Sequence, residues 1–137
     1  MRQGMVRALV LTAGIVIGAT GTSVLSAQHL PMKPTMLIQT DLVGSDGKQA
    51  NMYTIEAQPG VDLGRHYHPG HTFVYVLEGE LTVQQLDTPP ITYRPGQAFH
   101  EPPRVVHDAK SSSTTRPLKI LVFQAIETGQ PLAVPVK

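Results

Sequence analysis

Two histidines separated by one residue, His66 and His68, are the first sign of chemistry in this sequence. Residues two apart on a β-strand point to the same face, so an extended chain places both imidazoles side by side. Neutral imidazole is a good ligand for divalent transition metals, and a neighbouring pair can begin a metal site. His107 supplies a third imidazole if the fold returns it to this pair. Five of the six histidines lie between His66 and His107, which indicates a site in this part of the chain.

The segments that must position these histidines have the pattern of short β-strands. After residue 27 the sequence shows no sustained helical periodicity, and Gly and Pro turns interrupt it at close spacing. Many short strands between such turns predict an all-β sandwich or barrel. The expected strands cover residues 35–42, 51–57, 61–68, 73–77, 80–86, 91–93, 97–101, 105–109 and 118–124.

Composition limits the kinds of site and partner. The chain has 137 residues, a formal net charge of +1 at pH 7 and no cysteine. That length is enough for one domain with its own core. Without cysteine, disulfides, thiolate nucleophiles and Cys-type zinc sites are excluded, and any metal must be held by His, carboxylate or water. Without a basic patch or charge run, nucleic acid is not an expected partner.

Residues 1–27 have the layout of a secretory signal peptide. Arg2 and Arg7 form a short positive region, an uncharged and mostly apolar run follows, and small residues end at a candidate cleavage site after Ser26 or Ala27. The alternative is an uncleaved membrane anchor, for which the apolar run is short. We expect a periplasmic or secreted protein that is free of the membrane after cleavage. The remaining expected boundaries are an arm and first strand over 28–45, a barrel over 46–128 and an irregular tail over 129–137.

Two spaced motifs extend the histidine pattern. Gly60 is followed by five residues, then by His66-Tyr67-His68, and the motif closes at Gly79. Gly96 is followed by five residues, then by Pro102, and His107 comes five positions after that proline. In both spacings the chain resembles the cupin superfamily, in particular the small exported bacterial single-domain cupins of type 2. The resemblance implies a jelly-roll barrel, also called a double-stranded β-helix, with a metal on His66, His68 and His107.

The chain departs from the family pattern at three positions. Thr72 stands where the family has Glu, Arg104 where it has Gly, and Ser111 where it has Asn. The family Glu is usually the fourth protein ligand, and a neutral Thr hydroxyl is a poor ligand for a divalent cation. The resemblance therefore implies a three-His site without the acid. Such a site has open positions, as catalytic metal sites do, and no carboxylate offsets the charge of the ion.

Other polar residues near the motifs are candidates for roles beside the metal. Glu101 and His71 are the catalytic candidates, and Glu101 could act from a neighbouring strand as a ligand or as a general base. The alternative for each is a solvated residue at the rim of the barrel. Thr72, His100 and Arg104 are candidates for supporting the ligands or contacting a substrate.

Two classes of function fit these residues. The first is an enzyme, with dioxygenase-, decarboxylase- or isomerase-like chemistry at a mononuclear three-His metal, as the resemblance implies. The second is a non-catalytic module that binds a small molecule or sugar and has a degenerate or structural metal site. An acid or base facing the metal divides the two classes, so Glu101 or His71 at the site would favour the enzyme.

The sequence also leads to expectations about the identity of the metal and the oligomeric state. A chain exported unfolded acquires its metal outside the cytoplasm, where imidazole ligands favour zinc or copper over iron, manganese or nickel. Residues 73–77 and 118–123 are apolar on both strand faces, which is more surface than one small barrel can cover. We therefore expect a homodimer built on sheet packing, with a small molecule as ligand or substrate.

Overall fold

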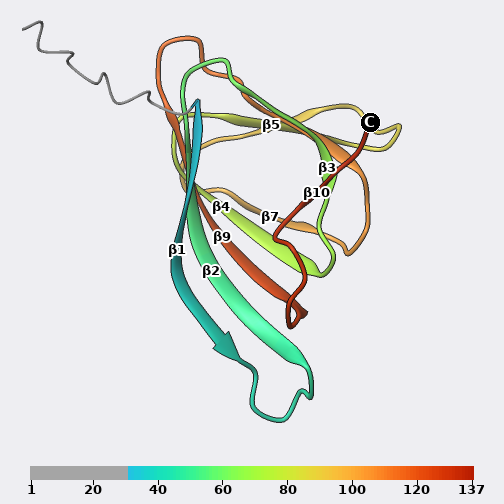
Figure 1. Cartoon of the computed structure of the whole chain (residues 1–137). Helices are drawn as coiled ribbons and strands as arrows, with labels where there is room; N and C mark the ends of the chain where they lie inside the picture. Colours follow the sequence, from blue (N-terminus) through green and yellow to red (C-terminus); the bar gives the residue numbers. More distant parts are fainter. Residues whose placement is uncertain (1–30) are drawn as a thin grey trace, which may run out of the picture.

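The regular structure of the described part of the chain consists of β-strands (Figure 1). The computed structural model describes residues 31–137, so the predicted signal peptide over 1–27 lies outside the described residues. Within 31–137, no helix is long and apolar enough to cross a membrane. The strands are β1 (Met32–Asp41), β2 (Lys48–Ala57), β3 (Asp62–Tyr67), β4 (His71–Glu78), β5 (Leu81–Gln85), β6 (Ile91–Tyr93), β7 (Ala98–Glu101), β8 (His107–Ser111), β9 (Leu118–Glu127) and β10 (Val134–Pro135).

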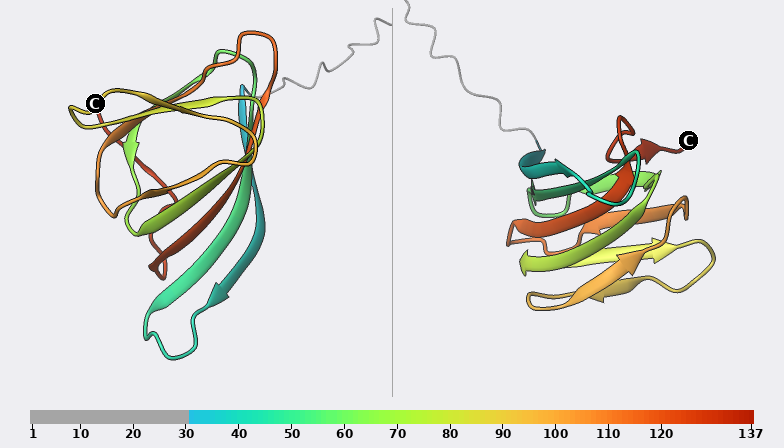
Figure 2. Two further views of the ribbon diagram at one scale, coloured as in Figure 1. Left: turned by 180° about the vertical axis from the view of Figure 1, so that it is seen from behind. Right: turned by 90° about the horizontal axis from the view of Figure 1, so that it is seen from below.

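The strands form two five-stranded antiparallel sheets. One sheet has the order β1-β2-β9-β4-β7 and the other the order β10-β3-β8-β5-β6. Figures 1 and 2 show the two sheets on facing sides of a barrel. The all-β prediction is confirmed, because the described residues form strands in two facing sheets. Apart from β1-β2 and β5-β6, neighbouring strands are not consecutive in sequence, as in a jelly roll.

The core lies between the sheets and follows the two-residue period of the strands. In β4, Val74 and Val76 point inward and are buried, whereas Phe73, Tyr75 and Leu77 point outward and remain exposed. The apolar character of both faces of this strand, noted in the sequence, therefore serves the core on one side only. Strand β9, paired with β4 and β2, adds inward side chains of the same kind. They are Leu118, Ile120 and Val122.

The C-terminal tail is part of the barrel, contrary to the expectation of an irregular segment. Val134 pairs with Tyr67 and Pro135 pairs with His66, so β10 extends the sheet beside β3. The backbone N–H of Val136 also donates to the carbonyl oxygen of Arg65, at 2.9 Å. The tail therefore lies against the strand that carries the first histidine motif.

Arg104 adopts a backbone conformation that favours glycine. Its φ is 61°, in the left-handed region, and it occupies the motif position where the family pattern has Gly. Its backbone N–H donates to the carbonyl oxygen of His68, at 2.8 Å. This bond anchors the chain just after the His66–His68 pair. This backbone conformation is therefore retained, although it is unfavourable for a residue with a Cβ atom.

We predict that Arg104→Gly stabilises the protein by about 1 kcal/mol, because glycine adopts the left-handed region without the clash of a Cβ atom. The exposed Arg104 side chain takes part in no ion pair among the described residues. The free energy of unfolding from urea titration measures the effect. Lys110→Gly, at an exposed position of β8, is the control and should destabilise by roughly 1 kcal/mol. An Arg104→Gly variant less stable than the native protein would contradict the conclusion that the backbone is strained at Arg104.

Candidate metal centre

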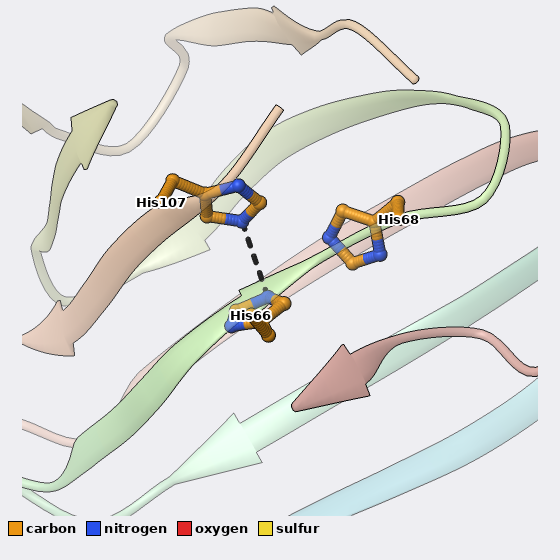
Figure 3. A group of neighbouring side chains, drawn as sticks. All are labelled: His66, His68 and His107. Carbon is orange, nitrogen blue, oxygen red and sulfur yellow. Dashed lines mark hydrogen bonds between the residues drawn. The ribbon is translucent and has the colours of Figure 1, made fainter. Parts of the chain in front are cut away.

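Three imidazoles meet in the interior of the barrel (Figure 3). His66 lies on β3 directly opposite His107, the first residue of β8, and His68 follows the end of β3. Each residue offers one ligand atom, and these atoms all lie within 4.8 Å of one another. The Nε2 atoms of His66 and His107 are 3.1 Å apart. His68 and His107 are buried, and His66 is half-buried.

The Nδ1 atom of each imidazole is already engaged by the backbone. A carbonyl oxygen can only accept a hydrogen bond, so each Nδ1 must carry the proton and donate it. In a neutral imidazole this leaves Nε2 with a free lone pair. The three pairs are His66 with Gly64 at 2.9 Å, His68 with Leu132 at 2.6 Å and His107 with Val105 at 3.0 Å.

A carboxylate joins the imidazoles from the other sheet. Glu101 ends β7 and is only 4% exposed. Its Oε2 is 3.1 Å from Nε2 of His68, and its Oε1 is 3.1 Å from Nε2 of His107. The expectation of a centre without an acid is therefore wrong, as is the alternative of Glu101 as a solvated rim residue. The reason is register: Glu101 pairs with Thr72, and directly paired residues present their side chains on the same face.

The donor set fits a divalent metal ion. Lone pairs and a carboxylate that face one another at 3.1 Å repel unless a proton or a metal ion lies between them. Ligand atoms bound to one ion at about 2.0–2.2 Å are themselves roughly 3 Å apart when the bond angles are near tetrahedral or octahedral. The observed separations match that value. The carboxylate would offset one of the two charges of the ion.

Burial keeps His66 in its metal-binding form. Desolvation lowers the pKa of His66 below its usual 6.5, and the neighbouring imidazoles of His107 and His68 lower it further. The hydrogen bond to the Gly64 carbonyl and the charge of Glu101 act in the opposite direction and are outweighed. The neutral form therefore persists below the pH at which an ordinary imidazole gains a proton, and the neutral form is the one that binds a metal.

A second hydrogen-bonded group orients His68. Thr72 is fully buried, and its Oγ1 accepts a hydrogen bond from Nε2 of Gln124 at 3.1 Å. The same amide donates at 2.8 Å to the carbonyl oxygen of Leu132, which also accepts the Nδ1–H of His68. Thr72 thus supports the ligands indirectly. The sequence analysis did not single out Gln124, although a polar residue on the inward face of an apolar strand was a usable signal.

A cavity of about 310 Å³ opens beside the three imidazoles and Glu101. Tyr53 lines it and is 2% exposed. Burial raises the pKa of Tyr53, and the charge of Glu101 raises it further, so the phenol keeps its proton. Arg65 borders the cavity through its position on β3, and its exposed side chain lies on the outer face beside Asp108. Most of the remaining wall is apolar, with Met32, Pro34, Ile55, Leu63, Leu81 and Leu132 among its residues.

Three residues predicted to serve the site lie elsewhere. His71 and His100 point to the outer face of the barrel, where His71 Nδ1 and His100 Nε2 are 2.9 Å apart. The odd-numbered residues of β4 face outward, so the predicted catalytic role of His71 is wrong. The side chain of Arg104 is exposed at a separate, smaller cavity of about 180 Å³. Of the supporting residues predicted, the structure brings Thr72 alone to the centre.

Solved structures with the same fold include proteins of several kinds. A cupin-like protein from Thermotoga maritima is 24% identical, with a TM-score of 0.61 and coverage of 77% of this chain and 75% of the other. The DMSP lyase DddQ from Ruegeria pomeroyi is 23% identical, with a TM-score of 0.61, and the chain covers only 52% of its length. For these two matches 77% of this chain is aligned. KdgF from a Halomonas species is 20% identical, with a TM-score of 0.53 over 69% of this chain and 78% of the other.

Sequence comparison defines the family. No curated protein sequence matches the chain. The family model for the cupin domain matches residues 53–124, which is more than half of the chain and includes His66, His68, Glu101 and His107. The two motifs, the two facing sheets and this match agree, and the chain belongs to the cupin family.

Proposed function

We propose that this chain is an exported, metal-dependent cupin enzyme that acts on a compact, mostly apolar small molecule. The ion would be held by His66, His68, His107 and Glu101. One observation carries the proposal: a buried carboxylate 3.1 Å from two imidazole nitrogens, at the wall of an apolar cavity. An acid or base facing the metal would favour the enzyme over the binding module, and Glu101 is a carboxylate that faces two of the imidazoles.

The residues around the centre have different roles in the proposed catalysis. When bound, the ion supplies a Lewis acid with positions open to a chelating substrate or O₂. The contacts of Glu101 with two imidazoles favour its role as the fourth ligand rather than as a free base. Tyr53 then remains as the neutral protein group that can donate a hydrogen bond in the cavity. Dioxygenation, decarboxylation, isomerisation and, because a DMSP lyase shares the fold, elimination are the classes to test.

The cavity wall selects among substrates. A sugar buried there would leave most of its hydroxyl groups without hydrogen-bond partners, and each such group costs free energy. A molecule with an apolar body buries that body favourably against the wall. One anionic or chelating group could reach the ion, since the three imidazoles and Glu101 line the cavity. We therefore favour a small apolar acid or chelator over the sugar-binding alternative.

Localisation and metal identity complete the proposal. We infer export to the periplasm or beyond from the layout of residues 1–27. Imidazole-rich sites loaded outside the cytoplasm favour zinc or copper by intrinsic affinity, and a single carboxylate does not reverse that order. Cell fractionation tests the first inference, and elemental analysis of protein purified from its native compartment tests the second. Iron or manganese as the dominant metal would contradict the affinity argument.

The first prediction concerns the metal itself. The protein should bind about one divalent ion tightly, and His107→Ala should weaken that binding by roughly 100-fold or more, because removing a ligand costs more than removing its supporting partner. Competition with a chelator of known affinity measures the change. Asp108→Ala, the next residue with its side chain facing outward, is the matched control and should bind as the native protein does. Equal affinity in the His107 variant would disprove the centre.

A second prediction tests whether Glu101 is a metal ligand. Glu101→Thr should lower metal affinity by roughly 10–100-fold, and Glu101→Gln, which keeps the shape, should do the same. The double variant Thr72→Glu/Glu101→Thr should recover most of the loss, since residues 72 and 101 face each other across β4 and β7. The same competition assay measures all three variants. If Glu101→Thr binds the metal as tightly as the native protein, Glu101 is not a ligand.

The substrate class gives a third prediction. Metal-loaded protein should bind benzoate at least about tenfold more tightly than glucuronate, because the two share a carboxylate and differ in the body that contacts the apolar wall. Isothermal titration calorimetry measures both, with His107→Ala as the control that lacks the full ligand set. Incubation with a panel of small apolar acids under air, followed by mass spectrometry, tests turnover. Tighter glucuronate binding would reverse the assignment, and binding of the panel without any product would support the non-catalytic module.

A further inference from the structure

The two outward-facing histidines form a second cluster of metal-ligating atoms, separate from the interior centre. His71 Nδ1 and His100 Nε2 are 2.9 Å apart, and their rings are stacked with centroids 5.1 Å apart. The ring of Phe73 stacks on that of His100, with centroids 4.8 Å apart, and holds it in place. A separation of 2.9 Å also suits two nitrogens bound to one ion at about 2.0–2.1 Å. The pair supplies half of a four-ligand set.

An uncharged row extends from this pair across the whole sheet. Directly paired residues place Ile38 on β1, Met52 on β2, Phe123 on β9, Phe73 on β4 and His100 on β7 in one line. Four strand spacings give the row a length of about 19 Å. The side chains of Ile38, Phe73 and Phe123 are 53%, 46% and 36% exposed, so no other described part of the chain covers them.

Such a row is self-complementary. When two copies pack face to face with their two-fold axis along the row, each residue lies opposite its own copy. Phe73 then packs on Phe73, and Phe123 on Phe123. The two copies of His100 meet on the axis, each with His71 beside it, and the four imidazole nitrogens can surround one ion. No charged residue belongs to the row, so this packing buries no unpaired charge.

We propose that a second copy of this chain binds the outer face of the β1-β2-β9-β4-β7 sheet, and that His71 and His100 of both copies share one zinc ion. The metal site is incomplete without the second copy, which makes the assembly dependent on zinc. This shared site is separate from the interior centre, because neither histidine contacts that centre.

The test is sedimentation of the full mature protein, loaded at its interior centre, during titration with zinc. The expected result is a zinc-dependent dimer that takes up one further zinc per two chains. His71→Ala/His100→Ala should weaken dimerisation in zinc by roughly 100-fold, because it removes every ligand of the shared ion. Gln84→Ala, at an exposed position of β5 in the other sheet, is the control and should dimerise as the native protein does.

Three outcomes would overturn the shared site. They are a monomer at every zinc concentration, a dimer that the histidine variant leaves unchanged, and uptake of one further zinc per chain without association. The interior centre is checked separately with His107→Ala, which should keep the zinc-dependent dimer while it loses the interior ion. A dimer lost in His107→Ala but kept in the double histidine variant would assign the zinc effect to the interior.

Discussion

The arrangement of electron pairs inside the barrel constrains the rest of the structure. Three imidazoles donate hydrogen bonds from Nδ1 to backbone carbonyls, so three Nε2 lone pairs and the carboxylate of Glu101 face one small space. In a medium of low polarity this arrangement is unfavourable without positive charge at its centre. The surrounding strands hold the donors together against their mutual repulsion, and a bound ion would relieve that repulsion. Folding stability and metal affinity are therefore linked in this protein.

The sequence predicted the histidines, but it left Glu101 open between a role at the metal and a solvated residue at the rim. The spacing of His66, His68 and His107 is local to each motif, and it required only that two strands meet. The carboxylate depends on which residue of β7 pairs with Thr72, and register between distant strands is set by the whole sheet rather than by local spacing. The motif at position 72 is thus satisfied by Glu101, across one strand pair. A search by motif alone misses this carboxylate, because it lies on β7 and not at the motif position on β4.

The supporting groups show the same limit of sequence reasoning. Gln124 was detectable, because it is polar at a position of β9 whose parity matches the core residues Ile120 and Val122. The carbonyl of Leu132 was not, since a backbone group carries no sequence signal and proline-containing tails seldom pack. By fixing His68, this carbonyl makes the last residues of the chain part of the centre. Turn spacing and strand periodicity predicted an all-β sandwich or barrel, and the resemblance to cupins implied the barrel. Its closure over the ligands needed the tertiary structure.

Strand β4 shows how one element can serve two sites without conflict. Its even-numbered residues reach the interior, where Thr72 supports His68, and its odd-numbered residues reach the outer face, where His71 meets His100. Because the period is two, each face can change while the other is kept. The neighbouring strand β7 divides its side chains in the same way, with Glu101 inside and His100 outside. Adjacent residues of both strands therefore belong to different sites, and an ion on the outer face would stiffen the strand pair that carries the inner carboxylate.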